Sequence, residues 1–183
     1  MLRDRLKNLT KPFHDEVEQN STGGSVMEKT ITKNEYINML SSFYSYLKPF
    51  EDVLLIHKDM FLQRGIDVTK RFRSHLLENN LATLGVQLPE IKNYNHKEFE
   101  QLVGTFYVYE GSTMGGMALY KMLGEIEFAK DARSYFLPYG ENTMTYWKEF
   151  TNFLVALSDE KDFNESKAIL AACETFLNLK SGK

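Results

Sequence analysis

The four histidines of the chain, His14, His57, His75 and His96, are the residues whose spacing first limits its chemistry. Hydrolytic metal sites usually need two or three histidines a few residues apart on a helix. No two histidines in this chain lie within five residues of each other. If the protein uses iron, the pattern favours one histidine ligand to an iron that another group, such as haem, already holds.

His14 has the best-placed neighbours of the four. His14 and Glu18 are four residues apart, so on a helix they lie on the same face. A metal-binding histidine commonly donates its second ring N–H to an oxygen atom, which Glu18 could supply. Lys7 and Lys11 precede His14 on the same side and could meet anionic groups of a ligand. The same residues also describe an ordinary surface His–Glu pair on a charged helix, and their spacing does not separate the two interpretations.

The segment Gly111-Ser112-Thr113-Met114-Gly115-Gly116 is the second feature that could carry chemistry. Each glycine inside a helix costs roughly 1 kcal/mol relative to alanine, so a helix with three of them in six residues needs a reason. Gly111 and Gly115 share one helix face, and Gly116 lies beside it. A helix without side chains on that face lets a planar ligand approach its backbone.

Three other interpretations of this glycine segment can be weighed from its sequence. A phosphate-binding loop needs Lys and then Ser or Thr after its last glycine, whereas Met117 and Ala118 follow Gly116. A close helix–helix crossing through Gly111 and Gly115 is one open alternative. A plain loop between two shorter helices is the other, because Gly-Ser-Thr favours turns.

The apolar residues recur at helical spacing nearly everywhere, and no run of alternating β-branched residues indicates a strand. The sequence therefore predicts an all-α fold. Around His14 the apolar repeat begins at Leu2, but Pro12 falls inside it, so we expect a regular helix from about Pro12 onward.

Capping residues, glycines and prolines predict the other element boundaries. We expect a capping box at Thr32–Glu35, and we expect Pro49 to bend or break the helix that follows. Two further capping boxes are expected at Asn95–Glu98 and Asp162–Glu165. The remaining expected elements are a loop at 21–30, a helix at about 69–84, a helix from the second box to about 123, a short helix within 130–137, a helix at 142–157 and a last helix to about 179.

The length and composition predict one ordinary domain spanning residues 1–183. The chain is 43% hydrophobic, which is enough to form a core and argues against disorder. It has 22 Lys plus Arg and 25 Asp plus Glu, a formal net charge of -3. Nucleic-acid-binding proteins usually carry a basic surplus, so no nucleic-acid partner is expected.

The single cysteine and the N-terminal residues bear on the compartment. Cys173 cannot form an intramolecular disulfide, and we interpret it as a small core residue because its neighbours are apolar. Residues 1–7 are charged where a signal peptide needs an apolar run, and no window approaches the length of a membrane span. We expect a cytoplasmic protein with no membrane partner.

Four segments, taken together, resemble a known family. Residues Tyr107–Gly116 closely resemble the distal-helix signature of bacterial haem oxygenases, particularly the bacteriophytochrome-associated branch. Residues Leu6–Glu18 resemble the proximal-helix pattern of that family. Residues Leu47–Glu51 and Phe136–Gly140 resemble two further family segments, and all four occur in the family's order.

The resemblance implies a single-domain haem-oxygenase-like helical bundle with haem between a proximal and a distal helix. His14 is then the axial ligand of the haem iron, with Glu18 as its hydrogen-bonding partner. Lys7 and Lys11 fall where the family often keeps basic residues near the haem propionates. The distal residues implied over the haem are Gly111, Ser112, Gly115 and Gly116, with Tyr109 as a further contact to the cofactor or its water network.

The implied activity is that of a haem oxygenase, in which haem is both cofactor and substrate. Haem, O2 and electrons are converted into biliverdin, Fe2+ and CO. The implied partners are an external electron donor, which would be a ferredoxin, a flavodoxin or a reductase, and a bacteriophytochrome as a biliverdin acceptor.

Two departures from the family pattern keep a second interpretation open. Ser112 stands where mammalian-type enzymes carry an Asp, and Tyr146 stands where bacterial relatives often have an Arg, so that Lys148 would have to replace it. The alternative is a haem-binding or haem-sensing protein of the same fold that does not turn haem over.

Three other classes fit the sequence less well. A di-iron oxidase of this fold needs Glu-x-x-His motifs, and the sequence has none. A thiamin-degrading enzyme needs a reactive cysteine in its pocket, and Cys173 lies near the C-terminus. A helical interaction module without a ligand does not account for the three glycines of 111–116.

Overall fold

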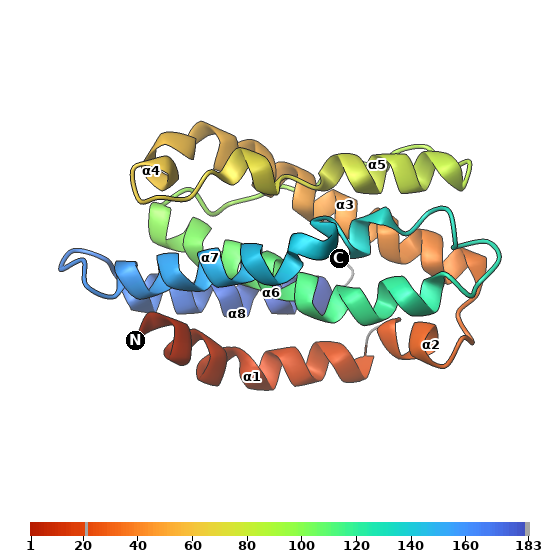
Figure 1. Ribbon diagram of the computed structural model, residues 1–183, viewed down its shortest axis with the longest axis horizontal. Coiled ribbons are helices and arrows are strands. Elements are labelled where there is room, and N and C mark those ends of the chain that lie inside the picture. Colours follow the sequence, from red (N-terminus) through yellow and green to blue (C-terminus); the bar gives the residue numbers. More distant parts are fainter. Residues whose placement is uncertain (21, 182–183) are drawn as a thin grey trace.

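Helices make up all of the regular secondary structure in the computed structural model, which describes residues 1–20 and 22–181 (Figure 1). The prediction of an all-α fold is confirmed for these residues. The helices are α1 (Leu2–Asn20), α2 (Gly23–Met27), α3 (Lys33–Ile56), α4 (Lys58–Leu62), α5 (Ser74–Thr83), α6 (Phe99–Leu123), α7 (Thr143–Leu157) and α8 (Glu165–Ser181). Short 3-10 turns lie at Val68–Arg71, Ser134–Phe136 and Gly140–Asn142.

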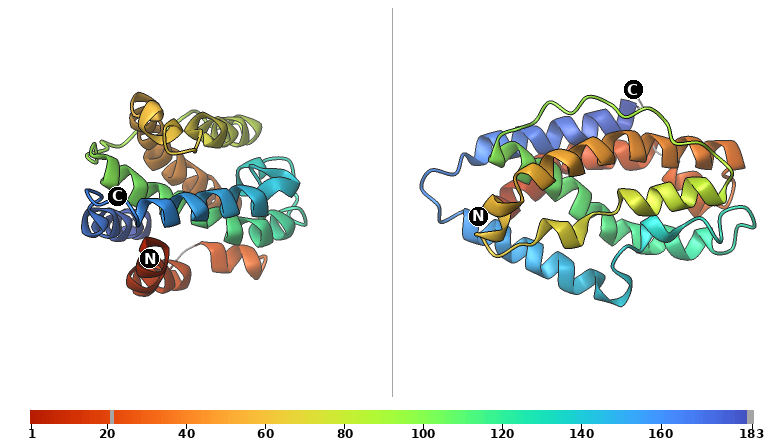
Figure 2. Two further views of the ribbon diagram at one scale, coloured as in Figure 1. Left: turned by 60° about the vertical axis from the view of Figure 1, so that its left-hand side comes forward. Right: turned by 90° about the horizontal axis from the view of Figure 1, so that it is seen from above.

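Helix α6 runs through the middle of the bundle and packs against α7 and α8, while α1 lies along α8 (Figures 1 and 2). The close approach of α6 to α8 occurs at Gly104, which is buried. A Cβ atom added there would overlap the carbonyl group of Ala168 and would lie 3.1 Å from the nitrogen of Ala172. The two helices therefore touch backbone to backbone at a point that only glycine permits.

Aromatic side chains determine how α6 is rotated about its axis. The ring of Phe106 meets that of Phe150 on α7 edge to face, with centroids 4.8 Å apart. The ring of Tyr109 stacks on Phe50 of α3 at 5.2 Å. Such pairs stabilise a core by about 0.5 to 1.5 kcal/mol each beyond the burial of their area. Because these residues point into the core, Gly111 and Gly115 face elsewhere.

Neither proline interrupts its helix, so the start expected near Pro12 and the break considered at Pro49 are both wrong. Helix α1 already begins at Leu2 and continues through Pro12, and α3 is continuous through Pro49. The start of α1 is held by tertiary contacts, because Leu2 and Leu6 are fully buried. The backbone N–H of Leu2 also donates to the hydroxyl of Ser158, 2.7 Å away. Packing of this first turn outweighs the missing hydrogen bond at the proline.

The capping box at Thr32–Glu35 is confirmed, since each side chain bonds the other's backbone N–H. The box expected at Asn95–Glu98 is wrong, because the box is formed by Glu98 and Gln101 and the helix begins at Phe99. The difference arises because His96, inside the expected box, makes tertiary contacts instead.

Two boundaries near the C-terminal third also differ from expectation. The box expected at Asp162–Glu165 is wrong, because Asn164 accepts the backbone N–H of Lys167 at 3.2 Å and α8 begins at Glu165. The short helix expected within 130–137 is only the 3-10 turn Ser134–Phe136. Local polar residues compete for the same free N–H groups, so sequence alone does not rank them.

The helix expected at 69–84 starts later, at Ser74, after the separate turn Val68–Arg71. The carboxylate of Glu51, on α3, accepts the backbone N–H groups of Arg73 at 2.7 Å and of Ser74 at 3.2 Å. A carboxylate at a helix N-terminus satisfies N–H groups that have no partner within the helix. The start of α5 is thus decided by a residue more than twenty positions earlier in the chain.

Part of the expected loop at 21–30 is helical. Residues Gly23–Met27 form α2 because Val26, which is fully buried, anchors this turn in the core. Residue 21 lies outside the described residues.

Two expectations drawn from apolar content can be compared with these helices. Within residues 1–20 and 22–181 no helix is both long enough and apolar enough to cross a membrane. Cys173 is half-buried beside the core rather than enclosed in it.

The contact at Gly104 predicts a large effect on stability. The Gly104→Ala variant should lose at least about 2 kcal/mol of unfolding free energy, because two backbones must separate to admit the methyl group. Denaturant unfolding followed by circular dichroism measures this loss. The matched control is Gly24→Ala, where an added Cβ meets nothing within 4 Å. Equal stability of the two variants would contradict the packing argument.

Candidate active site

His14 lies on α1 with about half of its side chain exposed (52%). Its ring meets the ring of Phe176 on α8 edge to face, with centroids 5.8 Å apart. Its Nδ1 atom lies 3.7 Å from a carboxylate oxygen of Glu18 and 3.8 Å from one of Asp15. The carboxylates therefore gather at Nδ1, and Nε2 is the ring nitrogen that faces no ion-pair partner among the described residues.

The two predicted basic residues lie on the same helix as His14 but differ in their contacts. The ammonium group of Lys11 donates to Asp15 at 2.6 Å, and this bond holds the pKa of the Asp15 carboxyl below its ordinary value. Lys7 is exposed. The structure thus places both at the surface of α1, with Lys11 engaged by a carboxylate.

The glycine segment lies within the continuous helix α6, which excludes a loop at this position. A Cβ atom added at Gly115 would meet nothing within 4 Å, and one added at Gly111 would meet only Trp147, at 3.8 Å. Among the described residues, only the Trp147 side chain of α7 comes within 4 Å of these two positions, and the close helix–helix crossing is made at Gly104 instead. The two glycines leave a stretch of α6 backbone bare.

Gly116 has a different role from its two neighbours in the motif. A Cβ atom added there would lie 2.6 Å from the carbonyl oxygen of Phe136. Gly116 is buried, and its missing side chain allows the Ser134–Phe136 turn to lie directly on α6. The structure therefore separates Gly116, which packs, from Gly111 and Gly115, which are open.

Helices α1 and α6 run in the same direction (Figure 1). The side chain of Thr10 on α1 lies close enough to the hydroxyl of Tyr107 on α6 to affect its pKa. Burial raises the pKa of the Tyr107 hydroxyl, and its hydrogen bond with Thr10 opposes that shift. His14 lies four residues beyond Thr10, and Gly111 lies four residues beyond Tyr107. Since an α-helix advances one turn in about four residues, His14 and Gly111 each lie one turn beyond this contact along their own helix.

Ser112 is held by an arginine that sequence reasoning missed. Arg73 is 2% exposed, and its guanidinium donates to the Ser112 hydroxyl at 3.0 Å and to the backbone carbonyl of Tyr109. The Ser112 hydroxyl itself donates to the Tyr109 carbonyl at 2.7 Å. Buried arginines are rare unless they are paired, so these hydrogen bonds indicate that Arg73 is part of the structure that holds the glycine segment.

Other buried charged residues contact Arg73 or lie near it. Burial raises the pKa of Glu51, although the backbone N–H of Arg73 bonds its carboxylate and opposes the shift. The neighbouring residue Arg71 pairs with Glu110, which also accepts the hydroxyl of Tyr139 at 2.6 Å. The only sequence signal for this network is charged residues at otherwise apolar helical positions, such as Glu110 directly before Gly111.

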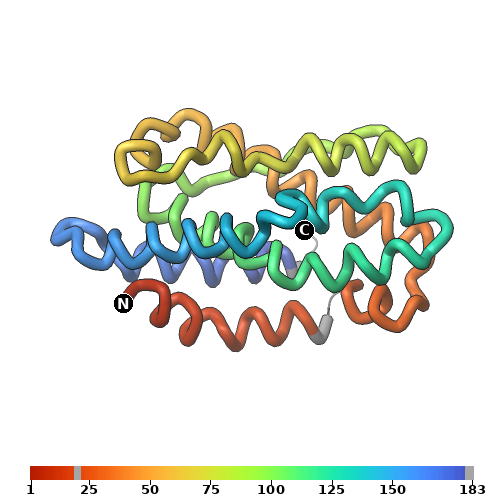
Figure 3. The backbone as a smooth tube through the Cα atoms, viewed as in Figure 1, coloured from red at the N-terminus to blue at the C-terminus, as the bar shows by residue number. Residues whose placement is uncertain are grey.

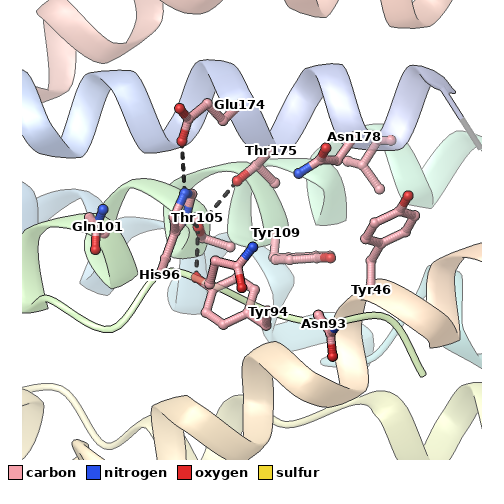
Figure 4. A pocket seen from close by; sticks show the side chains of 12 residues that line it. Tyr46, Asn93, Tyr94, His96, Gln101, Thr105, Tyr109, Glu174, Thr175 and Asn178 are labelled. Carbon is pink, nitrogen blue, oxygen red and sulfur yellow. Dashed lines mark hydrogen bonds and ion pairs between the residues drawn. The ribbon is translucent and has the colours of Figure 1, made fainter. Parts of the chain in front are cut away.

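Tyr109 is placed away from the bare face. Its ring is buried against Phe50, and burial also raises the pKa of its hydroxyl well above the ordinary value. The side chain lines a cavity between α3, α6 and α8 (Figure 4). Residues two apart on a helix point in different directions, so Tyr109 and Gly111 do not share a face.

Tyr146 packs against an aromatic ring and a guanidinium. The Tyr146 ring stacks on Tyr139 at 4.2 Å, and the Arg71 guanidinium lies over it at 4.8 Å from the centroid. Lys148, two residues later, is exposed. Tyr146 therefore holds Arg71 and the buried network in place.

The family model described as "Heme oxygenase" matches residues 1–180. The chain belongs to the haem oxygenase family. A solved structure titled as the NO- and CO-bound haem oxygenase of Neisseria meningitidis is similar in fold, with a TM-score of 0.83 over 100% of this chain and 89% of that one. The two sequences are 22% identical. A search of curated protein sequences found no match.

The residues of this haem oxygenase family member fit a flat iron-containing ligand. A histidine nitrogen is a common ligand of haem iron, and glycines let a helix backbone come close to a flat ligand. His14 offers the donor, and the open Cβ positions at Gly111 and Gly115 offer the wall. The ring of Phe176 beside His14 adds an apolar edge.

The two adjacent glycines of the distal segment predict stability changes of opposite sign. Gly115→Ala should raise the unfolding free energy of the ligand-free protein by up to about 1 kcal/mol, because alanine favours the helix and meets no neighbour. Gly116→Ala should lower it by about 1 to 3 kcal/mol, because its methyl group meets the Phe136 carbonyl. Denaturant midpoints of the two variants give the comparison. A loss of stability in Gly115→Ala would show that the face is not open.

Proposed function

We propose that this chain is a haem oxygenase that binds haem between α1 and α6 and, with O2 and electrons, converts it into biliverdin, Fe2+ and CO. The observation that carries the proposal is the pair of open glycines, Gly111 and Gly115, one and two turns beyond Tyr107 on α6, with His14 one turn beyond Thr10 on α1. Family membership over nearly the whole chain supports it.

His14 is the proposed iron ligand. Its Nε2 atom would bind the metal, while the Glu18 carboxylate lies close enough to accept a hydrogen bond from Nδ1–H after a small side-chain rotation. A neutral imidazole held in this way would supply one nitrogen ligand to the iron, and the α6 backbone would lie near the bound haem. Lys7 and Lys11 are proposed to meet the propionates, for which Lys11 would exchange its bond with Asp15.

The distal side is proposed to act through backbone and through Ser112. Bound haem supplies the iron at which O2 is reduced. The backbone at Gly111 and Gly115 would cover that side closely and limit the room for bulk water. Ser112, fixed by Arg73 and by the Tyr109 carbonyl, would hold an ordered water on its remaining lone pair.

The partners are proposed on chemical grounds. The reaction consumes electrons, so a ferredoxin, a flavodoxin or a reductase would supply them in the cytoplasm. A bacteriophytochrome is the proposed acceptor of biliverdin.

A second function is favoured by one observation. The Ser112 hydroxyl already donates its only proton to the Tyr109 carbonyl, so it has none to give to a bound ligand. The alternative is therefore a protein that binds or senses haem without turning it over.

Haemin addition to the purified protein separates these functions. We expect a Soret band typical of histidine-ligated haem, followed under air by its replacement with biliverdin absorbance when ascorbate or a ferredoxin system is supplied. A Soret band that persists under reduction and O2 would favour the haem-binding function. Absence of a Soret band would exclude both.

His14→Ala tests the proposed ligand. We expect the variant to stay folded and to lose the histidine-type Soret band and turnover, because alanine at this position of α1 offers no imidazole to bind the iron. The matched control is His75→Ala, since His75 is exposed on α5. Unchanged spectra and activity in His14→Ala would remove His14 from this role.

A further inference from the structure

The last turns of α8 are attached to α6 differently from its first turns. The first turns touch α6 backbone to backbone, at Gly104 against Ala168 and Ala172. After Ala172, α8 buries Thr175 and Phe176, while Leu177 is 44% exposed. Phe176, whose ring contacts His14, belongs to these later turns. Helix ends held by few buried contacts open more readily than helix centres.

Polar contacts hold these later turns (Figure 4). The Nε2 atom of His96 lies 2.8 Å from the carboxylate of Glu174 on α8. The Nδ1 atom of His96 lies 3.2 Å from the hydroxyl of Thr105 on α6. The hydroxyl of Thr175 donates to that of Thr105 at 3.2 Å. His96 thus links α8 to α6 through its two ring nitrogens.

The stretch that carries His96 is itself anchored. It connects α5 to α6 and runs back along the bundle without helical structure (Figures 2 and 3). The backbone N–H of Lys92 donates to the Ser45 carbonyl, and the Ser45 hydroxyl donates to the Glu90 carbonyl, each at 2.9 Å. The hydroxyl of Tyr94 donates to Thr105 at 2.9 Å. His96 therefore extends from a fixed base rather than from a loose loop.

The surroundings of the pair favour its persistence. The His96 side chain is 15% exposed and that of Glu174 is 46% exposed. Both line a cavity of about 540 Å³, and none of the described residues that line it is a lysine or arginine. Among these described lining residues, no lysine or arginine competes with His96 for the carboxylate.

We propose that the His96–Glu174 pair positions the last turns of α8, and through Phe176 sets the orientation of the His14 ring. The proposal rests on the proposed function of His14 as the haem ligand. His96 and Glu174 are positioning residues, since neither contacts the ring of His14 itself.

Two variants of His96 separate its two contacts. Glutamine places its side-chain amide near the position of Nε2, so His96→Gln can still donate to Glu174. Asparagine places its amide near the position of Nδ1, so His96→Asn keeps the contact with Thr105 and loses Glu174. His75→Asn, at an exposed position on α5, is the control.

The first measurement uses the protein without haem. Backbone amides of residues 174–179 should exchange hydrogen about threefold to tenfold faster in His96→Asn, the range expected for loss of one partly exposed hydrogen bond. In His96→Gln the exchange should stay near that of the unchanged protein. Equal exchange in both variants would overturn the proposed contact.

The second measurement uses the haem-loaded protein. Haem transfer to apomyoglobin should be faster in His96→Asn by a similar factor, with a shifted Soret band, and near normal in His96→Gln. Faster amide exchange with unchanged haem transfer and spectrum would overturn the link to His14. If the unchanged protein binds no haem, the proposed function fails, whereas amide exchange still reports separately on the His96–Glu174 contact.

Discussion

The structure depends on other parts of the chain that approach the backbone of α6 closely at separate points along the helix. At Gly104 the neighbour is the backbone of α8, and at Gly116 it is the carbonyl of Phe136. Between them, at Gly111 and Gly115, nothing in the described chain fills the space beyond the Trp147 ring. The two packed glycines hold the helix in place, and the two open ones leave the surface that we assign to haem.

Buried charged residues support the glycine segment of α6 through hydrogen bonds. Arg73 reaches the Ser112 hydroxyl, and Glu51 fixes Arg73 by accepting its backbone N–H. Burying charges costs free energy unless they are paired and hydrogen-bonded, and truncating one partner leaves the other uncompensated. This network therefore ties α3, the start of α5 and the distal segment of α6 into one unit.

Sequence patterns predicted the helices well where local chemistry decides. The capping box at Thr32–Glu35 is such a case, because both partners lie within one turn. Local reasoning failed where a distant residue decides: Glu51 sets the start of α5, and burial of Leu2 carries α1 through Pro12. The glycine segment was recognised from its composition, but composition did not distinguish Gly116, which packs, from Gly115, which is open.

The sequence by itself determined that the chain is helical, that His14 and Glu18 share a helix face, and that another helix contains three glycines, which have no side chains, within six residues. These properties depend on the helical period and on residue type, and both are local. Only the tertiary structure decided that His14 and Gly111 lie one turn beyond the same contact. It also decided that Tyr109 turns away into the core and that Arg73 supports Ser112. Such placements depend on how helices pack and on which charges are buried together, and neither is encoded within a single turn of chain.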